Sequence, residues 1–163
     1  MKAVMKQWMF LFLLLAFPAI LYLFLQEFGK NEYNIPMLYE NGAEGNECVP
    51  KSNAPYKIPD SVRRIIGGEN KSVVVITEDS PRNKEAAEEI EKKIVGKLGA
   101  FVFLSSLSEA AQKKALCFLM MQKSANAVLI DKKNRIRGYY QLSKKKECER
   151  LQDELSILFT RKK

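Results

Sequence analysis

The side chains best suited to redox or metal chemistry are three cysteines, Cys48, Cys117 and Cys148. None of them lies in a Cys-x-x-Cys or Cys-x-x-x-Cys pair, so the spacing that sets a nucleophilic thiol beside a resolving one is missing. Histidine is absent, which excludes His-based triads, histidine zinc sites and histidine general bases. The sequence therefore predicts no catalytic residue and no enzyme activity.

A soft-metal site is the first alternative. Cys117, Met120 and Met121 fall at positions i, i+3 and i+4 and so share one face of a predicted helix. Three sulfur ligands at this spacing could hold Cu(I), which favours thiolate and thioether ligands. Buried cysteine and methionine are more often plain core packing. We favour core packing, with no cofactor, and keep copper as the alternative.

The other two cysteines differ in their surroundings. Cys148 lies on an apolar stripe with Leu151, Leu155 and Leu158, which predicts a core thiol. Cys48 lies in an irregular stretch, where it could pair with Cys148, form an intermolecular disulfide or stay free. An odd number of cysteines excludes a fully paired intramolecular set, and the sequence does not choose among these outcomes.

Acidic side chains at predicted strand ends are further candidates, namely Glu78, Asp79 and Asp131. The carboxyl ends of strands in open α/β sheets host ligands. No reaction can be written for these groups without histidine or a paired nucleophile, so no small-molecule substrate is identified. Asp79 is expected to cap the helix that follows it.

From residue 61 onward, strands and helices alternate. We predict strands over 71–77, 100–104, 126–131 and 135–141, and helices over 81–98, about 108–122 and from Ser143 onward. Ser80 and Pro81 predict the start of the first helix. The resulting order is β-α-β-α-β-β-α, with the first two strands parallel. The fold class is α/β, with a thioredoxin-like domain that follows an N-terminal transmembrane helix.

The N-terminal region predicts that transmembrane helix. Residues 8–25 hold neither charge nor glycine, and they would span about 27 Å at ~1.5 Å per residue. We therefore predict a membrane anchor over 1–28, an extended linker over 29–60 and a domain over 61–163. A cleaved signal peptide is the alternative, but no Ala-x-Ala site follows the run. Lys2 and Lys6 place the N-terminus in the cytoplasm, which in a bacterium puts the domain on the periplasmic side of the inner membrane.

The formal net charge of +8 indicates which kinds of partner the domain would attract. A basic domain beside a membrane favours anionic lipid headgroups or an acidic protein. The aromatic and basic residues do not interleave, so no nucleic-acid partner is expected.

Two stretches resemble the Sco/SenC family of membrane-anchored, thioredoxin-fold copper chaperones for cytochrome oxidase assembly. They are Tyr56-Lys-Ile-Pro-Asp60 and Val128-Leu-Ile-Asp-Lys-Lys-Asn-Arg-Ile-Arg-Gly-Tyr-Tyr140. The family binds copper through a Cys-x-x-x-Cys pair after the first core strand and a histidine before the late hairpin. The corresponding positions hold Asp79 and Asn83, and the histidine position falls near Lys123.

The resemblance thus implies a divergent member without the copper ligands. It predicts a non-catalytic accessory or interaction protein linked to respiratory oxidase assembly. A copper carrier with the relocated sulfurs of Cys117, Met120 and Met121 is the first alternative, and a thiol-disulfide protein is the second.

Overall fold

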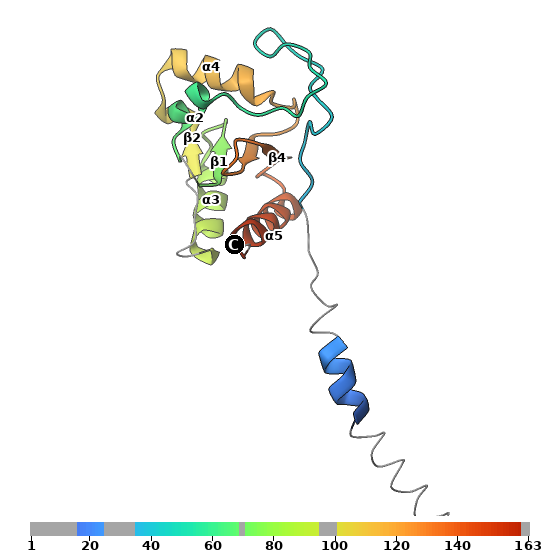
Figure 1. The fold of residues 1–163 in the computed structure, drawn as a ribbon. Coiled ribbons are helices and arrows are strands. Elements are labelled where there is room, and N and C mark those ends of the chain that lie inside the picture. Colours follow the sequence, from blue (N-terminus) through green and yellow to red (C-terminus); the bar gives the residue numbers. More distant parts are fainter. Residues whose placement is uncertain (1–15, 25–34, 69–70, 95–100, 161–163) are drawn as a thin grey trace, which may run out of the picture. The chain divides into compact units, whose positions relative to one another are not determined.

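The computed structural model describes residues 16–24, 35–68, 71–94 and 101–160 (Figure 1). The chain divides into two compact units, Met1–Asn34 and Ile35–Lys163. In the first unit, residues 16–24 form a helix, and its large apolar side chains, such as Phe17 and Leu23, are exposed. None of the helices in the described ranges is both long and apolar enough to cross a membrane. Residues 8–15 and residue 25 of the predicted span lie outside those ranges.

The second unit is a mixed α/β structure, as predicted. Its elements are α2 (Asp60–Ile66), β1 (Val73–Ile76), α3 (Pro81–Lys93), β2 (Phe101–Phe103), the 3₁₀ turn η1 (Leu104–Ser106), α4 (Glu109–Leu119), β3 (Ala127–Ile130), β4 (Ile136–Tyr140) and α5 (Lys145–Thr160). From β1 onward the main elements follow the predicted order. Helix α2 was not predicted.

The four strands form one sheet in the order β2-β1-β3-β4. Strand β1 pairs in parallel with β2 and antiparallel with β3, and β3 pairs antiparallel with β4. Every residue of β1 and β3 is buried. The sequences of these two strands are continuous apolar runs because helices cover both faces of the sheet.

Alternate residues of the central strands enter two separate cores. Val73 and Val75 pack with Val62 of α2 and Leu119 of α4. Their neighbours Val74 and Ile76 pack on the opposite face, against α3 and α5. The sheet therefore lies between two helical layers, α2 with α4 and α3 with α5 (Figure 1).

The first residues of the helices can be compared with the caps predicted from the sequence. The Ser80 hydroxyl accepts a hydrogen bond from the Asn83 amide at the start of α3, as predicted. Helix α3 ends at Lys93, earlier than predicted, and residues 95–100 are outside the described ranges. The prediction that Ser143 caps the last helix is wrong, because α5 begins at Lys145 and the Lys144 carbonyl accepts from the Cys148 amide.

Residues 35–59 belong to the second unit, although the sequence assigned them to an extended linker. They form no helix or regular strand, only an isolated bridge between Ala43 and Ser52. The Leu38 amide donates to the Ile136 carbonyl of edge strand β4 at 3.1 Å. Ile58 is 1% exposed and lies in the core beside α2. This segment therefore covers part of the sheet edge, which would otherwise offer free backbone groups to other chains.

Candidate functional site

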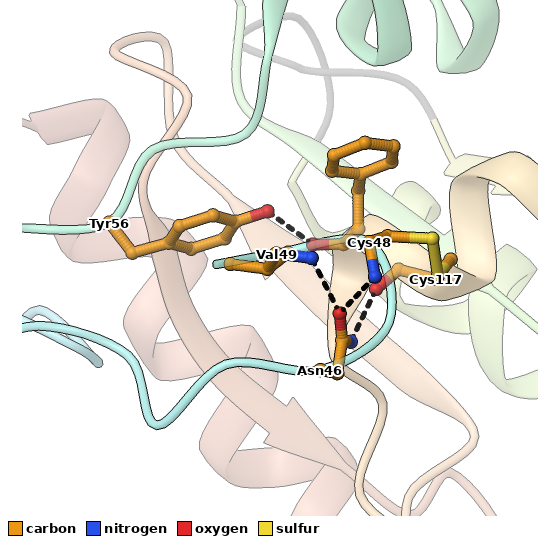
Figure 2. The surroundings of a disulfide bond; sticks show 6 residues. Asn46, Cys48, Val49, Tyr56 and Cys117 are labelled. Carbon is orange, nitrogen blue, oxygen red and sulfur yellow. Dashed lines mark hydrogen bonds between the residues drawn. A yellow bond between two sulfur atoms is a disulfide. The ribbon is translucent and has the colours of Figure 1, made fainter. Parts of the chain in front are cut away.

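A disulfide joins Cys48 to Cys117, with 5.8 Å between the Cα atoms and a sequence separation of 69 (Figure 2). Of the outcomes that the sequence left open for Cys48, pairing with Cys148 does not occur, and Cys148 is a free thiol. A disulfide sulfur is not a thiolate, which is the form of cysteine that binds metals. In this oxidised form, Cys117 cannot act with Met120 and Met121 in the copper site that the sequence analysis kept as an alternative.

Side chains from distant parts of the chain cap the end of α4 next to this disulfide (Figure 2). The Asn46 side-chain amide donates to the Cys117 carbonyl at 2.8 Å. The Tyr56 hydroxyl donates to the Phe118 carbonyl at 2.7 Å. The Tyr139 hydroxyl donates to the Leu119 carbonyl at 2.8 Å. Three carbonyls without partners inside the helix are thereby satisfied.

The tyrosines at this helix end are neutral hydrogen-bond donors. Burial raises the pKa of Tyr56 to about 12, with a further contribution from nearby Tyr39. Burial and a hydrogen bond with Tyr39 raise the pKa of Tyr139 further still. These hydroxyls keep their protons at neutral pH, so their arrangement serves structure and does not suit proton transfer.

A hollow of about 750 Å³ lies beside the capped end of α4. Its lining comes from the irregular segment and from the residues that follow α4, namely Met37, Leu38, Tyr39, Glu40, Asn41, Gly42, Glu44, Gly45, Asn46, Met120 and Met121. Gly42 has a φ of 107°, and a Cβ atom there would collide with the Ser52 carbonyl oxygen. Only glycine allows the segment to turn at this point. Met121 also packs against the core, as predicted, but both methionines line this surface hollow.

The positions that match family copper ligands have other contacts here. Asn83 is 1% exposed, and its side-chain amide donates to the Glu78 carbonyl at 2.9 Å. The Asn83 side-chain oxygen accepts a hydrogen bond from the side-chain amide of Asn126 at 3.3 Å. The Asn126 oxygen in turn accepts from the Leu142 backbone amide at 2.8 Å. Asn83 and Asn126 therefore connect the ends of β1, α3 and β3 with the turn after β4. Sequence reasoning did not identify Asn126, whose partners are far away along the chain.

Asp79 and Lys123 lie at the surface. The Asp79 carboxylate pairs with the Lys84 ammonium group at 2.8 Å and accepts from the Ser105 hydroxyl at 2.9 Å. These two hydrogen bonds lower the pKa of Asp79. Ser80, and not Asp79, caps α3 through its side chain. Lys123 is exposed in the turn between α4 and β3.

Replacing Asn83 or Asn126 by alanine is expected to lower the free energy of unfolding by about 1–3 kcal/mol, because each change leaves buried polar partners unsatisfied. Urea denaturation followed by circular dichroism measures this loss. Asn53→Ala, at an exposed position, should change stability by less than about 0.5 kcal/mol. Equal effects at the three positions would contradict a structural role for the buried pair.

Asp131 forms a buried ionic cluster within the β3–β4 hairpin. Its carboxylate accepts from the side chains of Arg135 at 2.8 Å and Arg137 at 2.9 Å. It also accepts from the backbone amides of Lys133 and Arg135. Burial alone would raise the pKa of Asp131, but these hydrogen bonds outweigh burial and lower it. This carboxylate therefore shapes the hairpin.

Cys148 is half-buried, and its thiol donates to the Leu142 carbonyl at 3.1 Å. Burial is the main cause that raises the pKa of this thiol. A raised pKa makes a cysteine a poor nucleophile at neutral pH. Its packing against Leu151 and Leu155 agrees with the predicted core position.

Across residues 16–24, 35–68, 71–94 and 101–160, no three His, Cys, Asp or Glu side chains gather in a way that could hold a metal ion. Comparison of the chain with protein-family models, curated proteins and solved structures finds no match.

Proposed function

We propose that this chain is a membrane-anchored, thioredoxin-like accessory protein that acts by binding other proteins and has neither a redox nor a copper site. The observation that carries the proposal is the Asn83–Asn126 pair at the end of β1. The resembled family places its paired cysteines in this region. Here a buried amide hydrogen bonds to the Glu78 carbonyl and to a second buried amide, an arrangement with no thiol.

The order of the elements supports the thioredoxin-like assignment. A parallel β1-α3-β2 unit is followed by α4, the antiparallel β3–β4 hairpin and α5. The two stretches that carry the Sco/SenC resemblance also contact each other. The Ile58 amide donates to the Asn134 carbonyl at 2.8 Å, and the Asn134 side chain donates to Asp60 at 2.7 Å. The proposed link to oxidase assembly rests on this resemblance.

Two features support a membrane location with the domain outside the cytoplasm. The helix over residues 16–24 exposes large apolar side chains, including Phe17, Ile20 and Leu23. A contiguous exposed apolar surface marks a site of membrane or protein contact. The Cys48–Cys117 disulfide fits an oxidising compartment, because disulfides are rare in the cytosol.

A copper carrier is the second candidate, since Met37 joins Met120 and Met121 around one hollow and thioethers favour Cu(I). Titration of the full chain with Cu(I) against a competing chelator separates the two functions. We expect no stoichiometric binding, whether the disulfide is oxidised or reduced. One tightly bound equivalent that is lost in Met120→Leu would establish the carrier instead.

A disulfide reductase assay tests the thiol-disulfide alternative. We expect the rate with the full chain to equal the rate with a variant that lacks all three cysteines. Turnover that depends on Cys148 or on the Cys48–Cys117 pair would contradict the proposal.

A further inference from the structure

The hollow beside α4 is acidic, whereas the chain as a whole is basic. Residues 35–50 hold Glu40, Glu44 and Glu47 and no lysine or arginine, although the chain has a formal net charge of +8. Glu40 and Glu44 line the hollow, and both are exposed. Charge complementarity at this position favours a cationic occupant.

The end of α4 adds to this negative potential. Backbone dipoles place a partial negative charge at a helix C-terminus. The groups that cap the last carbonyls are the side chains of Asn46, Tyr56 and Tyr139, which are all neutral. They satisfy the hydrogen bonds without supplying positive charge. A lysine or arginine placed in the hollow would therefore meet two carboxylates and a helix C-terminus.

Apolar side chains that can adapt their shape line the same hollow. Met37, Met120 and Met121 are three of the six methionines in the chain. Methionine side chains are unbranched and flexible, and they are common at surfaces that bind varied peptides.

The size of the hollow favours a peptide over a metal ion. Its volume of about 750 Å³ is in the range that holds several side chains. A single ion would fill only a small part of this volume.

We propose that this hollow docks a basic segment of a partner protein, which packs an aliphatic side chain on Met37, Met120 and Met121 and pairs lysine or arginine side chains with Glu40 and Glu44. The proposal rests on the interaction role proposed above and assigns it a surface. The Cys48–Cys117 disulfide and the Asn46 hydrogen bond hold the two walls of the hollow together. Reduction of the disulfide therefore weakens docking.

The methionines provide the measurement. The full chain is labelled with ¹³C at the methionine methyl groups, placed in a zwitterionic bilayer nanodisc and titrated with a short peptide of leucine and lysine. We expect saturable chemical-shift changes for Met37, Met120 and Met121. The methyl signals of Met1, Met5 and Met9 should stay in place, and they report any binding of the peptide to the lipid. A leucine and glutamate peptide of equal length should shift none of the six.

Matched variants test the charge and the disulfide. Glu40→Gln with Glu44→Gln should raise the Kd of the lysine peptide about three- to tenfold, as expected for two exposed ion pairs. Glu85→Gln with Glu88→Gln, at exposed positions on α3, should leave it within twofold. Cys48→Ser with Cys117→Ser should raise the Kd of the lysine peptide at least as much as the charge variant does. Cys148→Ser should leave this Kd unchanged.

Several outcomes would overturn the proposal. These are no saturable shift at the three methyls, equal shifts with both peptides, or an unchanged Kd in the Glu40 and Glu44 variant. Shifts produced by Cu(I) alone would assign the hollow to a metal. Concentration-dependent shifts without peptide would assign it to a second copy of the chain. Photo-crosslinking to a partner protein through another face, with no peptide bound, would refute the docking site and leave the interaction role intact.

Discussion

Joint replacement of Cys48 and Cys117 by serine is expected to lower the free energy of unfolding by about 4 kcal/mol. The disulfide closes a loop between positions that are 69 residues apart, and the lost entropy of the unfolded chain grows with the logarithm of loop length. The melting temperature should fall by roughly 10–20 °C for a domain of this size.

Thermal unfolding of the full chain, followed by near-ultraviolet circular dichroism with and without a reductant, measures this loss. The reductant should destabilise the unmodified protein and leave the double variant unchanged. Cys148→Ser serves as the control and should cost less than about 1 kcal/mol. A reductant effect that persists in the double variant would show that this disulfide is not its source.

Asp131→Ala is expected to lower the free energy of unfolding by about 3–5 kcal/mol, because it leaves the guanidinium groups of two arginines without their acid partner. The Asp131 side chain is only 4% exposed and that of Arg137 only 10%. Both groups are shielded from water, so solvent cannot compensate for the missing carboxylate. Asp79→Ala removes an ion pair whose Lys84 side chain is 55% exposed, and it should lower the stability far less than Asp131→Ala does.

The pH dependence provides a second measurement of the same cluster. The pKa of Asp131 is lowered in the folded protein, so its carboxylate stabilises the fold at pH values above the pKa of the unfolded chain. This stabilisation is lost as the pH falls from the usual pKa of an aspartate through the lower pKa of the folded protein, an acidic window. Asp131→Asn should flatten the stability profile in that window. A profile as steep as that of the unmodified protein would assign the acid sensitivity to other carboxylates.

The regular core could be predicted from sequence because its signals are local. The run of β-branched residues Val73–Ile76 predicts a buried strand, which the sequence placed over 71–77, and β1 occupies Val73–Ile76 within that range. The Ser80-Pro81 pair set the start of α3 correctly. Leu151 and Leu155 lie in the core, as the stripe of the last helix predicted. Helix α2 was missed because it has seven residues and no side-chain cap at Pro59, too short for a helical period to stand out.

The features around the hollow could not be predicted because they depend on contacts between distant residues. Nothing near Asn46, Tyr56 or Tyr139 in the sequence indicates that all three donate to the end of one helix. The choice of Cys117 over Cys148 as the partner of Cys48 depends on Cα separations that only the fold establishes. Asp131 did carry a local signal, since its carboxylate accepts from amides two and four residues later, as aspartate often does in turns.

The segment that covers β4 also constrains the order in which the chain can reach its final structure. Leu38 pairs with Ile136, the Tyr39 hydroxyl lies 3.2 Å from that of Tyr139, and Cys48 bonds to Cys117. A ribosome makes the first member of each pair some 70–100 residues before the second, a delay of several seconds at roughly 5–20 residues per second. Leu38 and Tyr39 therefore remain without their partners on β4 until that strand has been synthesised. Correct oxidation of Cys48 must wait for Cys117, and during that interval its thiol is open to other thiols and to chaperones.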